Sequence, residues 1–329
     1  MAANTESLPW LNQTWSKLTR QLERTPHALL FAGQPGLGKN RLAIEFAHLL
    51  LCMNPAGDAP CGNCKSCQLF AATNHPDMKV VTPLEEGKAI GIDQIRELNR
   101  YLTLTPHTSA RKVVLISPAE EMTTAAANSL LKQLEEPPLG SVLILISHHP
   151  HRLPATIRSR CSRIDFRAPE MAEAAQWLAA QGATTGATAA LAAAGNAPLA
   201  ALALVEQGFV EQRDKFLTDL LSLTRDGNPI SCAERWQKSG SETALAWFQG
   251  FLLDVLKASL NAASTQGEPG DWSNPDALKA IATIAQQVPA QQTAELLEVV
   301  NEGRRLLTTQ VDERLLIEDI LIRWNRVAA

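Results

Sequence analysis

The chain has 329 residues, 45% of them hydrophobic, and a formal net charge of −4. This length is enough for two or three domains with ordinary cores. The charge excludes a strong overall basic field, so any contact with nucleic acid would come from a local patch or from partner proteins. The N-terminal sequence lacks the basic and apolar regions of a signal peptide, and no apolar run approaches the roughly 18 residues of a membrane span. We therefore expect a cytoplasmic protein with no membrane segment, whose six cysteines are reduced or metal-bound.

Strand and helix patterns alternate over the first half of the chain. Short runs rich in β-branched residues are apolar on both faces, as is typical of parallel strands covered by helices. The expected strands are 27–33, 78–82, 112–117 and 142–147, and the expected helices are 39–51, 92–103 and 123–135. The order predicts an α/β domain over residues 1–168, with a parallel sheet and helices on both faces.

The pattern changes after Pro169. Residues 169–207 are rich in alanine and contain no strand signal, which predicts a small helical domain. Residues 208–329 show longer amphipathic helices, which predict an all-helical C-terminal domain. These helices are expected at 209–224, 241–261, 275–287, 290–307 and 311–326, with a loop at 265–275.

The segment GQPGLGKN follows the first expected strand and opens the first expected helix. Its residues Gly33, Gly36, Gly38 and Lys39 fit the phosphate-binding loop G-x-x-x-x-G-K-[ST]. In such a loop, glycines let backbone N–H groups face phosphate oxygens, and the lysine reaches the outer phosphates. The last position holds Asn40 instead of the hydroxyl residue that binds Mg²⁺.

A second group of residues that would bind Mg²⁺ is also missing. The acidic residues that hold Mg²⁺ and polarise water would stand at the end of strand 112–117, where the sequence has Ser117 and Pro118. Glu120 and Glu121 come later, and we expect them to be surface acids near a helix start. The sequence therefore argues against ATP hydrolysis and against bound Mg²⁺. Because Lys39 is retained, binding of ATP or ADP stays open.

Four cysteines lie within one short segment. The spacing of Cys52, Cys61, Cys64 and Cys67 contains two overlapping C-x-x-C steps, which suit a tetrahedral zinc site with four thiolate ligands. An iron–sulfur cluster and four free cysteines are the alternatives, but the spacing differs from common ferredoxin patterns. Four cysteine ligands leave no open position for catalysis, so we expect one structural zinc ion in a module over 52–67.

Several motifs together resemble a known family. HALLFAGQPGLGK, the cysteine module, HPD, NSLLKQLEEPP and RLPATIRSRC occur in this order, as they do in the clamp-loader subunits of bacterial DNA polymerase III. These are AAA+ proteins that open a ring-shaped sliding clamp and place it on primed DNA. The resemblance is strong over about the first 170 residues and architectural beyond them. It implies an AAA+ domain over 1–168, a helical lid over 169–207 and an oligomerising collar over 208–329.

Within this family, the gamma/tau motor subunits keep the loop hydroxyl, an Asp-Glu pair at the strand end and a lid arginine that senses the outer phosphate. The corresponding positions here hold Asn40, Ser117, Pro118 and Pro198. The chain thus resembles the family's non-hydrolysing subunit, which holds the ring together and has no ATPase activity of its own. The alternative is an ATP-hydrolysing motor subunit that tolerates Asn40. A zinc-dependent DNA binder acting alone fits the net charge of −4 poorly.

The resemblance also assigns site residues and partners. Arg160 of the SRC triplet matches an arginine finger, which stabilises charge on the phosphoryl group in the ATP site of a neighbouring subunit. A surface salt bridge and a DNA-phosphate contact are the alternatives for Arg160. Arg158 would assist there or contact DNA, and Lys132 would lie at an interface or near DNA. The implied partners are gamma/tau and delta subunits in a hetero-oligomeric ring at the nucleoid-associated replisome, with the sliding clamp and primer-template DNA reached through the complex.

Overall fold

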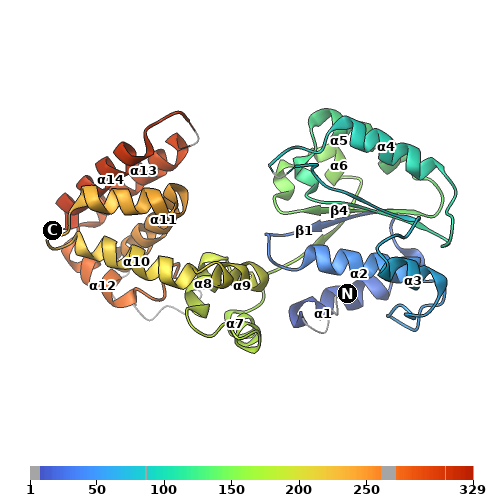
Figure 1. The fold of residues 1–329 in the computed structure, drawn as a ribbon, viewed down its shortest axis with the longest axis horizontal. Helices are drawn as coiled ribbons and strands as arrows, with labels where there is room; N and C mark the ends of the chain where they lie inside the picture. The colour runs from blue at the N-terminus through green and yellow to red at the C-terminus, as the bar shows by residue number, and fades with distance from the viewer. Residues whose placement is uncertain (1–7, 86, 261–271, 308, 329) are drawn as a thin grey trace. The chain divides into compact units, whose positions relative to one another are not determined.

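The computed structural model describes residues 8–85, 87–260, 272–307 and 309–328 (Figure 1). The chain divides into two compact units, Met1–Pro169 and Glu170–Ala329. Most of the loop expected at 265–275 lies outside the described residues.

The first unit contains a parallel sheet with strand order β2-β3-β4-β1-β5. The strands are β1 (Ala28–Ala32), β2 (Met78–Val81), β3 (Lys112–Ile116), β4 (Ser141–Ser147) and β5 (Ser162–Asp165). β1, β3 and β4 are buried along their whole length, as their apolar sequences predict. The prediction of a parallel α/β sheet is confirmed, whereas β5 was not predicted from the sequence.

Helices cover both faces of this sheet, as Figure 1 shows for α4, α5 and α6 on one face and α2 on the other. One face of β1 and β4 shares a core with Ile95 of α4, Leu130 of α5 and Ile157 of α6. The helices of the unit are α1 (Asn12–Thr19), α2 (Lys39–Leu51), α3 (Lys65–Ala71), α4 (Ile92–Thr103), α5 (Thr124–Glu135) and α6 (Ala155–Arg158). The helices expected at 39–51, 92–103 and 123–135 are therefore confirmed as α2, α4 and α5.

The described residues of the second unit are helical. They form α7 (Met171–Ala180), α8 (Ala187–Ala193), α9 (Pro198–Glu206), α10 (Phe209–Ser222), α11 (Pro229–Leu260), α12 (Leu278–Gln287), α13 (Ala290–Leu306) and α14 (Glu313–Ala328). Helices α10 to α14 share one core, in which Phe248, Phe251 and Trp324 are fully buried. The sequence predicted only the second half of α11, which is broken at Gly240 (φ 111°, ψ 103°). The helical C-terminal part is confirmed, and its division into lid and collar stays a prediction.

Apolar helices of the second unit are short. No single helix among the described residues is long and apolar enough to cross a membrane. The pair α8 and α9 passes the same test of length and composition only when the two are taken together, and they are bent by 119° relative to each other.

Candidate functional site

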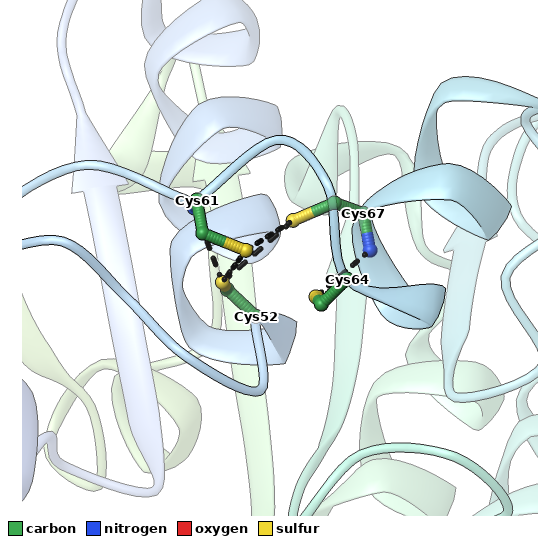
Figure 2. A group of neighbouring side chains, drawn as sticks. All are labelled: Cys52, Cys61, Cys64 and Cys67. Carbon is green, nitrogen blue, oxygen red and sulfur yellow. Dashed lines mark hydrogen bonds between the residues drawn. The ribbon is translucent and has the colours of Figure 1, made fainter.

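The four cysteines of the predicted zinc module converge in space (Figure 2). Cys52 follows the last residue of α2, Cys64 is the N-cap of α3, and Cys67 lies in its first turn. The Sγ atoms of Cys52, Cys61 and Cys67 are 3.6 to 3.9 Å apart, and all four Sγ atoms lie within 4.8 Å of one another. Four sulfurs placed 2.3 Å from a tetrahedral zinc ion would be separated by about 3.8 Å. The donor set and its spacing therefore fit zinc.

The chemistry of the thiols also favours a cation at this cluster. Burial alone would raise the pKa of Cys64, but hydrogen bonds to its sulfur, led by the N–H of Cys67 at 3.4 Å, outweigh burial and lower the pKa to about 6. Burial raises the pKa of Cys67 and of Cys52 above the usual thiol range. Without a cation, the cluster thus resists carrying four negative charges. A zinc ion would supply the positive charge that stabilises four thiolates.

A buried polar network attaches the cysteine module to the sheet. His75 Nε2 lies 2.8 Å from the Ser66 hydroxyl of α3, and the hydroxyls of Ser66 and Ser109 both donate to the carbonyl of Leu51 at the end of α2. The N–H of Asp77 donates to His75 Nδ1 at 3.1 Å. Ser66 and Asp77 are fully buried. The network makes the HPD motif a structural link rather than an accessible catalytic group.

Asp77 fixes the loop that precedes β3. Its carboxylate accepts backbone N–H groups from His107, Thr108 and Ser109 at 2.6 to 2.8 Å. Burial would raise the pKa of Asp77, but these three hydrogen bonds outweigh burial and hold the pKa below its usual value. The same residue therefore ties together β2, this loop and, through His75, the cysteine module.

The phosphate loop, residues 33–40, connects β1 to α2 as expected. Gly33, Gly36 and Gly38 all have positive φ values, of 155°, 77° and 87°. A Cβ atom on Gly33 would lie 2.5 Å from the carbonyl oxygen of Phe166, so only glycine fits between the loop and the end of β5. The loop therefore has the backbone that its sequence predicts.

Lys39 is turned into its own loop. Its ammonium donates to the carbonyl oxygens of Gly33 and Gln34, and the residue is only 2% exposed. Burial lowers the pKa of Lys39 to about 8, although the negative charge of Glu120 opposes this shift. The group that would reach a nucleotide phosphate is thus engaged by backbone carbonyls.

Asn40 and Ser117 stand at the two positions that would hold Mg²⁺, and their side chains contact each other directly. The Ser117 hydroxyl at the end of β3 donates to Oδ1 of Asn40 at 2.9 Å. Both groups are neutral, whereas Mg²⁺ is usually held through carboxylates and substrate phosphates. This arrangement gives a divalent cation no anionic ligand at these two positions.

Glu120 is not the surface acid that we expected. One of its carboxylate oxygens accepts the N–H groups of His148 and His149 at 2.7 and 2.9 Å, and its Oε2 atom is buried. Burial would raise the pKa of Glu120, but hydrogen bonds to the carboxylate outweigh it and lower the pKa. The expectation was wrong because the polypeptide after β4 returns to Glu120, a contact that sequence spacing does not indicate.

Arg160 lies near the amino ends of the parallel strands, whereas the phosphate loop lies at their carboxyl ends. Ser162, two residues later, is the first residue of β5 and pairs with Leu29 near the start of β1. The loop begins at Gly33, just past the other end of β1 and about 13 Å from Leu29 along the strand. Arg160 therefore does not face the phosphate loop of its own chain.

The Arg160 side chain forms a surface salt bridge, which was one of the alternatives to the arginine-finger role. Its Nη2 atom lies 2.7 Å from Oε1 of Glu135, and its Nη1 atom donates to the carbonyl of Thr156 at 2.9 Å. Both charged side chains are exposed by a third or more. The guanidinium is thus held at the surface, where another molecule can reach it.

The remaining predicted residues lie in separate places. Arg158 is the last residue of α6 and Lys132 is one turn before Glu135 on α5, and both are exposed. Pro198 is the buried first residue of α9, a position that favours proline. The structure brings Arg160 together with Glu135, a contact that the sequence did not predict. Their separate motifs contain no signal for this contact.

Comparison with known proteins gives the family. The family model described as DNA polymerase III, delta subunit, matches residues 10–170, and its C-terminal counterpart matches residues 207–326. DNA polymerase III subunit delta' of Pseudomonas aeruginosa is 36% identical over 322 residues, which are 96% of each chain. The Escherichia coli K12 protein of the same name is 33% identical and covers 96% of this chain and 94% of its own.

Solved structures resemble the chain more distantly. A DNA polymerase III gamma subunit-related protein from Thermotoga maritima is 18% identical, with a TM-score of 0.44 over 96% of this chain and 99% of that one. The family therefore follows from the sequence relatives and the two family models, which together span both units. Because those relatives match almost from end to end, the chain belongs to the family of DNA polymerase III subunit delta', a subunit of the clamp loader.

Proposed function

We propose that this chain is a non-hydrolysing subunit of the clamp loader that donates Arg160 to the ATP site of a neighbouring motor subunit. The observation that carries the first half of the proposal is the hydrogen bond between Ser117 and Asn40. It joins the two positions from which a motor would hold Mg²⁺, and neither residue is anionic. Lys39 is engaged by Gly33 and Gln34. Hydrolysis by this chain would lack the charges that the reaction requires.

The position of Arg160 supports the second half of the proposal. An arginine finger stabilises charge that develops on the transferred phosphoryl group, and in GTPases it increases the rate by about 10³ to 10⁵. Because Arg160 lies at the opposite end of the strands from its own phosphate loop, the phosphate that it contacts belongs to another chain. Hydrolysis in the neighbour would then depend on the docking of this subunit.

The partners follow from the proposed role. The relatives are named as subunits of DNA polymerase III, and we place this chain in a ring with gamma/tau and delta subunits. In that ring it would help to load the sliding clamp on primer-template DNA at the replisome. The exposed side chains Arg158 and Lys132 lie on the same unit as Arg160 and are available to a neighbouring subunit or to DNA phosphates.

A structural zinc ion completes the proposed subunit. The four cysteines would hold zinc between the end of α2 and the start of α3, with the Ser66–His75 contact anchoring the module. All ligands would come from the protein, so zinc would stabilise the fold and take no part in chemistry.

The decisive test compares wild type with Arg160→Ala in a clamp loader reconstituted with its motor subunits. We expect ATP hydrolysis stimulated by clamp and DNA to fall at least tenfold with the variant, while the complex still assembles. The isolated chain should show no ATP turnover above background, and Lys39→Ala should change nothing in that assay. Turnover by the isolated chain that is lost in Lys39→Ala, with an unchanged rate in Arg160→Ala, would instead establish the motor-subunit alternative.

A further inference from the structure

Arg160 and Glu135 come from two different motifs, SRC and LLKQLEEPP, and form an ion pair of 2.7 Å. We propose that Glu135 is a positioning residue, which orients the Arg160 guanidinium for contact with the neighbour's ATP. This inference rests on the proposed function of Arg160 as a finger that acts in trans. It adds a second residue of this chain, one that acts only through Arg160.

Core packing brings the two residues together. Glu135 is the last residue of α5, directly after Leu134, and Arg160 follows α6, where its N–H donates to the carbonyl of Ile157 at 3.1 Å. Leu134 and Ile157 belong to the same buried cluster. The backbone on both sides of the ion pair is therefore anchored by this cluster.

The ion pair restricts a side chain that would otherwise be mobile. An arginine side chain carries about 2 kcal/mol of rotamer entropy, and part of that must be lost before its guanidinium can act at one place. The Nη2 atom of Arg160 pairs with Glu135 of α5, and its Nη1 atom donates to the carbonyl of Thr156 on α6. Two anchors on different elements define the plane of the guanidinium before a neighbour docks.

The ion pair between Arg160 and Glu135 is weak enough for Arg160 to leave it and bind a phosphoryl group. The side chains of Arg160 and Glu135 are 36% and 50% exposed, and exposed ion pairs contribute little because water screens them. A phosphoryl group offers several charged oxygens in a site without bulk water, where charge-assisted hydrogen bonds are stronger. Glu135 can thus orient the finger without withholding it from the phosphate.

The test uses the complete reconstituted clamp loader and measures kcat and KM for ATP. Glu135→Ala should lower kcat by up to about fivefold, which corresponds to about 1 kcal/mol, the upper end for an exposed ion pair. KM should stay close to the wild-type value. Glu135→Gln keeps an acceptor without the charge and should give an intermediate kcat. Asp93→Asn, which likewise removes only the charge from the exposed pair with Arg96 on α4, serves as the matched control and should leave kcat unchanged.

Two further measurements separate positioning from a general structural effect. In the Arg160→Ala background, Glu135→Ala should cause no additional loss of rate, because Glu135 acts only through that arginine. In the isolated chain, the NMR signal of the Arg160 Nε–H group should show greater side-chain mobility in Glu135→Ala than in Asp93→Asn. The thermal midpoint of unfolding should change little in either variant.

Each result has a distinct meaning. An unchanged or increased kcat in Glu135→Ala, together with a reduced rate in Arg160→Ala, would overturn the positioning role and leave the proposed function intact. A loss of rate that persists in the double variant would also overturn it. An unchanged rate in Arg160→Ala would remove the proposed function, and the role of Glu135 with it.

Discussion

His75 shows how one buried residue links the cysteine module to the sheet. Its Nδ1 atom accepts the N–H of Asp77, so Nδ1 carries no proton. The Ser66 hydroxyl donates to Leu51, so the Nε2–H of His75 donates to the Ser66 oxygen. The hydrogen bonds therefore require a neutral ring. Burial lowers the pKa of His75, although the charge of Asp77 opposes the shift.

This protonation state predicts a pH dependence of stability. The ordinary pKa of histidine is 6.5, and the pKa of His75 in the folded protein is lower. Between these two values, the unfolded chain binds a proton at His75 that the folded chain does not bind. The free energy of unfolding should therefore fall as the pH decreases below about 6.5, by at most about 1.4 kcal/mol per pH unit from this residue. Denaturant unfolding of wild type and His75→Gln at pH 7.5 and 5.5 measures the effect.

His48 and His148 also have lowered pKa values and remain in both proteins, so the difference between the two reports on His75 and on its smaller contribution to the pKa of His48. His75→Gln should be less stable than wild type at pH 7.5 and should lose less stability on acidification. His151→Gln changes an exposed histidine and should keep the wild-type pH dependence. Equal pH dependence in wild type and His75→Gln would contradict the assigned neutral ring.

At the level of elements, α2 connects two sites. The phosphate loop precedes its first residue, Lys39, and Cys52 follows its last residue, Leu51. A helix of 13 residues is about 20 Å long, so the loop and the cysteine module lie at opposite ends of one rigid element. The module therefore supports the helix without approaching a phosphate in the loop.

Zinc binding can be tested on this element. The purified chain should contain close to one equivalent of zinc, and Cys64→Ser should lower this content clearly, because it removes a ligand whose pKa of about 6 favours the thiolate. Cys161→Ser alters a cysteine outside the cluster and should keep the wild-type content. Metal analysis after purification without chelators gives the answer. A chain without zinc, or with iron and a visible absorption band, would exclude the proposed zinc site.

At the level of the whole molecule, each unit has its own core. The core formed by β1, β3, β4 and the helices α4 to α6 lies within the first unit, and the core of α10 to α14 lies within the second. Trp324 is fully buried in the second core, where its indole N–H donates to the carbonyl of Leu220 at 3.3 Å. The two units are therefore expected to unfold as separate cooperative structures.

Scanning calorimetry can distinguish their transitions. Trp324→Ala should destabilise the second unit by about 3 to 5 kcal/mol, the usual cost of emptying such a site, and should lower only one transition. Removal of zinc by a chelator should lower the midpoint temperature of the first unit's transition only. A single transition, or a parallel shift of both by either change, would show that the units unfold together.

Much of the fold could be predicted because its signals are local. β1, β3 and β4 are continuous apolar runs, and the glycines and lysine of the phosphate loop lie within eight residues. β5 was missed because three of its four residues are exposed and polar, as the sequence SRID and its burial show. An edge strand of this kind is specified by pairing with β1, which no local pattern encodes.

The sequence by itself determined the class of fold, the phosphate loop with its missing magnesium ligands, and the cysteine cluster, because each is encoded by neighbouring residues. Tertiary structure alone decided the contacts between distant segments. Ser117 contacts Asn40 because the parallel sheet brings the carboxyl ends of its strands together, and Arg160 contacts Glu135 beside the amino ends. The same topology separates Arg160 from its own phosphate loop, since one lies near the start of β1 and the other follows its end.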